Sequence, residues 1–152
     1  MHTLKPEEAL DLIAVRENLE VMAAHLAADN IDEQTLDALR GMLKQQKLII
    51  QQSDMVEYSR ADAGFHSVMY QSTGNVFLCE LLGNIHSKLR PVAIQAREFM
   101  PIFYKEHVEI VDALAGHDPD LVEEKCRKHT QTIMGIIRSG KMTFISPYTE
   151  KP

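Results

Sequence analysis

The chain has 152 residues, of which 45% are hydrophobic, and this excludes a disordered chain and favours one domain with a sizeable core. Its formal net charge of −6 argues against nucleic-acid binding by this chain alone, because contact with phosphates requires a basic surface. No apolar run approaches the roughly 18 residues of a membrane span, and no signal-peptide pattern opens the chain. We therefore expect a cytoplasmic protein without membrane contact, in which Cys79 and Cys126 are buried reduced thiols.

Apolar residues recur at helical spacing almost throughout the chain, and no segment shows the alternation of a strand. Pro6, followed by two glutamates, is typical of a helix start, and Asp118-Pro119 is a second such signal. Gly74-Asn75 marks a break, since glycine can close one helix and asparagine can cap the next. The predicted apolar stripe of the first helix consists of Leu12, Val15, Leu19, Met22 and Leu26.

The predicted architecture is an all-α fold, an antiparallel bundle of about six helices. The helices are expected at about 6–28, 30–52, 53–72, 75–92, 101–114 and 118–139. We expect one helical domain over residues 5–139, followed by a loose tail over residues 140–152 that contains two prolines.

Four polar side chains are predicted to meet at one point of this bundle. Asp62 and His66 are four residues apart, so on a helix they share one face. His107 and His129 lie 11 residues before and 11 residues after Asp118, in the predicted turn between the last two helices. Two antiparallel helices leaving that turn would place both imidazoles at the same height, roughly 16 Å from the turn.

These four side chains together indicate a metal site, although a lone histidine on an apolar face is usually a hydrogen-bonded core residue. Burying an unpaired carboxylate is costly, and metal coordination removes that cost. Imidazole and carboxylate suit a divalent transition metal, with zinc as the first choice and Ni, Mn or Fe as alternatives. Of the other histidines, His86 is a candidate for a supporting contact, and the remainder are placed at the surface or in turns: His2, His25 and His117.

Arg16 allows two interpretations. It borders the apolar stripe of the first helix, and Glu20 is its neighbour one turn later, so it could be a surface side chain or one partner of an ion pair. Alternatively, it binds an anion beside the metal, because a guanidinium offers a carboxylate two parallel donors. The spacing alone favours the first interpretation, and Arg90 or Arg97 is the next candidate for the anion clamp if Arg16 does not bind the acid.

Three ordered segments carry a family resemblance: Val15-Arg-Glu-Asn-Leu-Glu20 with Ala23-Ala24 and Ala27-Ala28; Asp62-Ala-Gly-Phe-His66 with Gly74-Asn75 and Leu78; and Glu106-His107 with Ile110, Ala113 and His129. They resemble the opening helix, the central motif and the C-terminal motif of the FCD domain, the effector-binding half of FadR-type GntR transcription regulators. Each segment is short, but the ordered set is specific and covers roughly residues 8–138.

The resemblance implies a metal held by Asp62, His66, His107 and His129, with a nearby pocket for a small carboxylic acid. It also makes Arg16 a candidate effector-binding residue for the carboxylate of that acid. Regulators of this family carry an N-terminal winged helix-turn-helix domain, which this sequence lacks, and they act as dimers. We therefore expect a homodimer that contacts DNA only through an N-terminal domain absent from this chain.

The expected function is that of a non-enzymatic ligand sensor, in which the bound acid biases attached DNA-binding domains between two arrangements. The alternative is a mononuclear metal enzyme acting on a small carboxylic acid, with the metal activating water or a substrate oxygen. Against the enzyme, no additional Glu, Ser or Lys lies at a recognisable spacing to act as a base. A third hypothesis is a plain scaffold bundle with ion-paired histidines.

Overall fold

The computed structural model describes residues 4–93 and 97–141, and within these ranges it contains helices and no strand. The predicted all-α bundle is confirmed. Its elements are α1 (Pro6–Asn30), α2 (Glu33–Gln52), α3 (Met55–Gln71), α4 (Val76–Ala93), the 3-10 helix η1 (Arg97–Phe99), α5 (Met100–Ala115) and α6 (Pro119–Arg138). Most of the expected tail, residues 142–152, lies outside the described residues. None of the described helices is both long enough and apolar enough to span a bilayer.

Acidic caps begin three of the helices. The side chains of Asp32, Asp54 and Asp118 accept hydrogen bonds from the backbone N–H three residues later, at 2.7, 3.0 and 3.1 Å. Each cap satisfies a donor that a helix start leaves unpaired, and typically contributes about 1 kcal/mol. The six helices begin within three residues of the predicted positions because these signals are local in the sequence.

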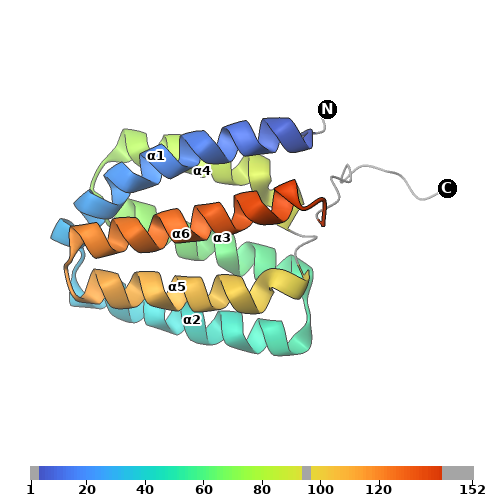
Figure 1. Ribbon diagram of the computed structural model, residues 1–152. Coiled ribbons are helices and arrows are strands. Elements are labelled where there is room, and N and C mark those ends of the chain that lie inside the picture. The colour runs from blue at the N-terminus through green and yellow to red at the C-terminus, as the bar shows by residue number, and fades with distance from the viewer. Residues whose placement is uncertain (1–3, 94–96, 142–152) are drawn as a thin grey trace.

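Each helix packs on at least two others. α1 packs most extensively on α6, α2 lies against α3 and α5, and α4 lies against α3 and α1. Figure 1 shows α1, α6 and α5 following one another across the front of the bundle, with α3 and α4 behind them. A tight turn joins α5 to α6, and His117 adopts a positive φ of 50° there. α5 and α6 therefore run antiparallel from this turn.

The core consists of two apolar clusters with polar side chains between them. On α3 one cluster contributes Tyr58 and the other contributes Phe65, and Asp62 lies between these two residues. α5 and α6 each contribute residues to both clusters as well. His107 on α5 and His129 on α6 lie where the helix passes from one cluster to the other. The predicted site residues thus occupy a polar layer near the middle of the bundle.

The predicted buried face of α1 was wrong. Val15 and Met22 belong to the predicted apolar stripe but are 52% and 53% exposed. The buried face carries Arg16, Glu20 and several alanines instead. Hydrophobicity alone misses this face, because alanine permits close helix packing and two opposite charges can be buried together when they pair.

Candidate metal centre

The four predicted ligands converge from α3, α5 and α6. One nitrogen of each histidine, His66, His107 and His129, lies within 4.8 Å of the other two. The Nε2 atoms of His107 and His129 are 3.3 Å apart. Asp62 Oδ1 lies 3.3 Å from His66 Nε2 and 3.5 Å from His107 Nε2. The equal offsets about the α5–α6 turn thus place both imidazoles beside the Asp62/His66 pair.

Two imidazoles of the site, those of His107 and His129, use their outer nitrogen, Nδ1, to donate a hydrogen bond. His107 Nδ1 donates to Gln46 Oε1 and His129 Nδ1 donates to Glu106 Oε1, each at 2.9 Å. A neutral imidazole carries one hydrogen, so the Nε2 atom of each ring presents a lone pair. Two lone pairs that face each other at 3.3 Å repel, and a cation bound by both would remove the repulsion.

Glu106 holds His129 in this orientation. Its second oxygen, Oε2, accepts a hydrogen bond from Thr132 Oγ1 at 2.6 Å, and its side chain is only 4% exposed. A carboxylate that accepts the outer N–H of an imidazole fixes the ring and makes its other nitrogen a better ligand. The sequence analysis used Glu106 only as part of a family motif and assigned it no such role.

Burial keeps two imidazoles of the site, those of His66 and His107, neutral near neutral pH. It lowers the pKa of His66 to about 4, against the opposing charge of Asp62. Burial and the neighbouring His129 hold the pKa of His107 well below its usual value. Burial alone would raise the pKa of Asp62, but the charge that His66 carries once it is protonated in acid, together with hydrogen bonds from His66 and His86, outweighs burial and holds this pKa well below its usual range. Near neutral pH, His66 and His107 thus offer neutral imidazole and Asp62 offers a carboxylate, the protonation states that bind metals.

The other histidines lie in different places. His86, predicted as a supporting residue, lies with its Nε2 3.3 Å from Asp62 Oδ2. His117 lies in the α5–α6 turn, as predicted, and its Nδ1 contacts the carbonyl oxygen of Ala28 at 2.8 Å. His25 is at the surface, 3.6 Å from a glutamate of α6, and His2 falls outside the described residues.

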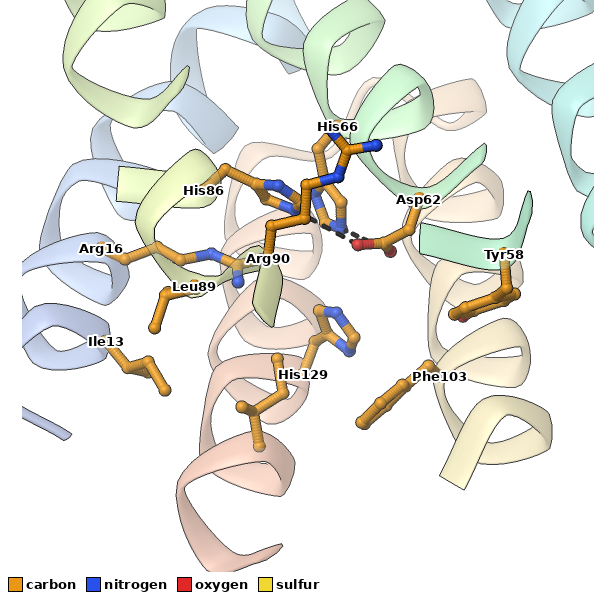
Figure 2. Close-up of a pocket in the computed structure, with 11 residues that line it drawn as sticks. Ile13, Arg16, Tyr58, Asp62, His66, His86, Leu89, Arg90, Phe103 and His129 are labelled. Atoms are coloured by element: carbon orange, nitrogen blue, oxygen red, sulfur yellow. Dashed lines mark ion pairs between the residues drawn. The ribbon is translucent and has the colours of Figure 1, made fainter. Parts of the chain in front are cut away.

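A cavity opens beside the predicted ligands, and Figure 2 shows three of them, Asp62, His66 and His129, among the residues that line it. Its volume is about 40 Å³, counted as the space open to the centre of a water molecule. The walls include three of the predicted ligands, Asp62, His66 and His129. The apolar side consists of Ile13, Leu89, Phe103 and Ile133. A small molecule in this cavity would contact the predicted metal site directly.

Arg16 enters the cavity from α1, and Figure 2 shows its guanidinium turned toward His86 and His129. Its Nε donates to Glu20 Oε1 at 3.0 Å, in a pair whose side chains are only 4% and 3% exposed. Nη2 of Arg16 is buried and has no hydrogen-bond partner among the described residues. The ion pair considered for Arg16 therefore exists, but it is buried rather than at the surface. It leaves one donor available to a ligand.

Tyr58 and Arg90 line the same cavity. The sequence analysis named Arg90 only as a further candidate for the anion clamp, and it did not select Tyr58. The hydroxyl of Tyr58 is buried and has no hydrogen-bond partner in the described part of the chain. Tyr58 lies four residues before Asp62, and Arg90 lies four residues after His86, so helical spacing could have indicated both. Gln46 gave no such signal, because its contact with the site depends on the packing of α2 on α5.

Comparisons with known proteins identify the family of the chain. The FCD domain family matches residues 11–132. "HTH-type transcriptional regulator LutR" of Bacillus subtilis (strain 168) is 25% identical over 142 residues, which cover 88% of this chain and 64% of LutR. "HTH-type transcriptional repressor NanR" of Enterobacter sp. (strain 638) is 31% identical over 121 residues, covering 73% of this chain and 42% of NanR. The solved structure of E. coli McbR/YncC superposes with a TM-score of 0.81 at 18% identity, covering 90% of this chain and 67% of that one.

The chain therefore belongs to the FCD domain family, the effector-binding domains of GntR-type transcription regulators. The resemblance seen in the three sequence segments is confirmed. The chain spans 64% and 42% of the lengths of LutR and NanR, so it corresponds to part of each regulator. At 18% identity, the likeness to McbR/YncC supports the fold alone.

Proposed function

We propose that this FCD domain senses a small carboxylic acid at a divalent transition metal held by Asp62, His66, His107 and His129. Binding of the acid would control DNA binding by a winged helix-turn-helix domain of the same regulator, which would act in the cytoplasm as a homodimer. The named relatives are transcription regulators, and this supports the sensor over the metal-enzyme alternative.

The charge balance of the buried groups carries the metal proposal. Asp62, Glu20 and Glu106 supply three carboxylates, and Arg16 supplies one guanidinium, with none of the four side chains more than 14% exposed. Three negative charges and one positive charge leave −2 on these four groups when the imidazoles are neutral. Uncompensated charge in a protein interior is costly, and a divalent cation would neutralise it.

The donor set also fits such an ion. Three imidazole nitrogens and one carboxylate are typical ligands of zinc, and nickel, manganese and iron accept the same donors. The 3.3 Å between the Nε2 atoms of His107 and His129 is compatible with two nitrogens that each lie about 2.0–2.1 Å from one zinc ion. A bound metal would supply a positive charge that attracts the carboxylate oxygens of an acid.

Two buried groups of the chain would complete the binding of the acid. Arg16 Nη2 is a donor without a partner among the described residues, and the Tyr58 hydroxyl is a second such group. A buried donor left unsatisfied costs about 1–3 kcal/mol. A carboxylate that accepts from both groups would recover part of this cost, which explains why a protein would keep them unpaired beside a cavity.

The test begins with protein purified without chelator. Elemental analysis and native mass spectrometry should give one divalent transition metal per chain, and chelator should lower the melting temperature. His129→Ala should lose the metal, whereas His25→Ala, which removes an exposed histidine, should keep it. A panel of small carboxylic acids should raise the melting temperature of the metal-loaded form only. The metal site would be disproved if the protein purified without chelator contained no metal and its melting temperature did not change on addition of chelator.

A further inference from the structure

A second group of metal-ligating side chains lies apart from the candidate metal centre, where the end of α1 meets the start of α6. It consists of His25 on α1 with Asp120 and Glu123 on α6, and one ligand atom of each lies within 4.8 Å of the other two. Asp120 and Glu123 are three residues apart, so they share one face of α6. Figure 1 shows these two helix ends side by side at the left of the bundle.

The spacing of the ligand atoms is that of donors around an ion rather than that of a hydrogen bond. His25 Nε2 lies 3.6 Å from Glu123 Oε2, which is too far for a hydrogen bond. Two donors bound to one zinc ion at the tetrahedral angle are about 3.4 Å apart. Three atoms at most 4.8 Å apart have a common point within about 2.8 Å of each, against 2.0–2.2 Å in a formed zinc site. The side chains of His25 and Glu123 are 45% and 27% exposed, so small rotations can close this difference.

The charges around this group favour a divalent cation. No ion pair joins Asp120 to a cation in the described part of the chain. Arg127 is shared between two carboxylates, with Nη1 3.0 Å from Glu17 Oε1 and Nη2 3.3 Å from Glu123 Oε1. Three carboxylates and one guanidinium leave −2 on these four groups. Glu123 Oε2, the oxygen nearest His25, is not the one that Arg127 contacts.

The imidazole of His25 distinguishes this group from an ordinary acidic surface. Asp120 lies in the first turn of α6, where the helix dipole favours a carboxylate, and Glu123 already pairs with Arg127. These two acids alone would therefore indicate no metal site. A nitrogen donor from a different helix, within 4.8 Å of both carboxylates, changes the chemistry of the group. Calcium and magnesium prefer oxygen ligands, whereas zinc, nickel and related ions bind imidazole and carboxylate together.

We propose that His25, Asp120 and Glu123 bind a second divalent transition metal, with zinc as the first choice, and that this ion joins the last turns of α1 to the first turns of α6. Water completes its coordination, because the group is open to solvent. With one imidazole in place of three, the site binds metal more weakly than the candidate metal centre. The inference does not depend on the proposed function, since the two groups share no residue.

Such an ion acts on the contact between α1 and α6. Its ligands come from both helices, so it binds only while α1 lies against α6. A ligand that binds one arrangement stabilises that arrangement as its free concentration rises above the dissociation constant. The site therefore makes the α1–α6 contact sensitive to free zinc.

The test is calorimetric titration of zinc into the full chain purified without chelator. The natural chain should bind an equivalent of zinc that depends on His25. His25→Ala should weaken this equivalent by at least about tenfold, because loss of a group that only orients a ligand already costs about 10–100-fold. Glu123→Gln should weaken it as well. Glu124→Gln is the matched control, because it removes the same charge from a neighbouring side chain that is 69% exposed, and its affinity should be unchanged.

Two further measurements separate a formed site from scattered surface binding. The nitrogen signals of the His25 imidazole should shift in nuclear magnetic resonance spectra as this equivalent binds, whereas those of His117, whose Nδ1 contacts the Ala28 carbonyl oxygen, should not. Added zinc should raise the melting temperature of the natural chain more than that of His25→Ala. Without added zinc the two proteins should melt alike, since His25 is at the surface.

The outcomes distinguish this site from the proposed function. Equal zinc affinities of the natural chain and His25→Ala, or a His25 imidazole whose signals do not shift, would overturn the second site. Absence of metal from the purified protein, with the His25-dependent equivalent still bound on titration, would instead overturn the proposed function and support the second site.

Discussion

Replacing Arg16 with methionine should destabilise the protein and weaken acid binding for two separable reasons. Arg16→Met leaves the Glu20 carboxylate buried, and among the described residues the Tyr70 hydroxyl, at 2.6 Å, is then its one remaining donor. Removing one partner of a buried pair typically costs about 3–5 kcal/mol, because the remaining charge is uncompensated. The double variant Arg16→Met/Glu20→Gln should recover most of that loss, since the amide oxygen still accepts from Tyr70. Arg40→Met, which breaks an exposed pair, should cost less than about 1 kcal/mol.

Urea unfolding of the four proteins gives the free energies, and calorimetry gives the acid affinity. Burial would raise the pKa of Glu20, but Arg16, His66 and the hydrogen bond from Tyr70 together outweigh burial and lower this pKa in the natural chain, with Arg16 contributing most. Without Arg16 the pKa should rise, so the Glu20 carboxylate can take up a proton and the penalty of Arg16→Met should shrink as the pH falls. Both variants that carry Arg16→Met should bind acid more weakly than the natural chain, whereas Arg40→Met should not. The reasoning would be refuted if Arg16→Met/Glu20→Gln were as unstable as Arg16→Met. It would also be refuted if these two variants bound acid as tightly as the natural chain.

Three further predictions concern metal affinity, pH and assembly. Glu106→Gln should weaken metal binding by about 10–100-fold in competition with a chelating dye, because His129 loses its carboxylate partner; an unchanged affinity would contradict this role. The pKa of His66 in the folded chain, about 4, lies below its ordinary value of 6.5, so the unfolded chain binds more protons than the folded chain between these two pH values. The free energy of unfolding of the metal-free protein should therefore fall by about 3 kcal/mol as the pH is lowered from 6.5 to 4. Urea unfolding at several pH values measures this loss, and a flat profile would exclude it. Light scattering should report a mass near twice 17.2 kDa, and a gel shift at low salt should show no DNA complex with a chain of net charge −6.

The helices could be predicted from the sequence because their signals are local. Acidic caps such as Asp32 and Asp118 lie next to the helix starts that they form, and apolar residues recur at helical spacing. The orientation of α1 could not be predicted in this way. Its most hydrophobic stripe includes Val15 and Met22, yet the buried face contains Arg16 and its ion-pair partner. Which face a helix buries depends on the neighbouring helices as well as on its own hydrophobicity.

The candidate ligands could be predicted because each is fixed by a short helical spacing or by its distance from a turn. His107 and His129 converge since both helices leave the same turn, and this needs no knowledge of the rest of the fold. Glu106 and Gln46 depend on contacts between helices, and no spacing in the sequence specifies which side chain reaches the outer nitrogen of which imidazole. The availability of Arg16 Nη2 for a ligand also becomes evident only when its burial and its pairing through Nε are known together.

The turn of α1 that contains Arg16 also accepts hydrogen bonds from α6. Glu17 accepts from Arg127 Nη1 at 3.0 Å and from Thr130 Oγ1 at 2.9 Å, and Thr130 directly follows His129 in the chain. An acid that bridges Arg16 and a metal on His129 would therefore add a second link between helices that Glu17 already joins. A ligand shifts an equilibrium only by its differential affinity for the two states. On the proposed function, the domain would signal if α1 had two positions relative to α6 and the acid bridged only one of them.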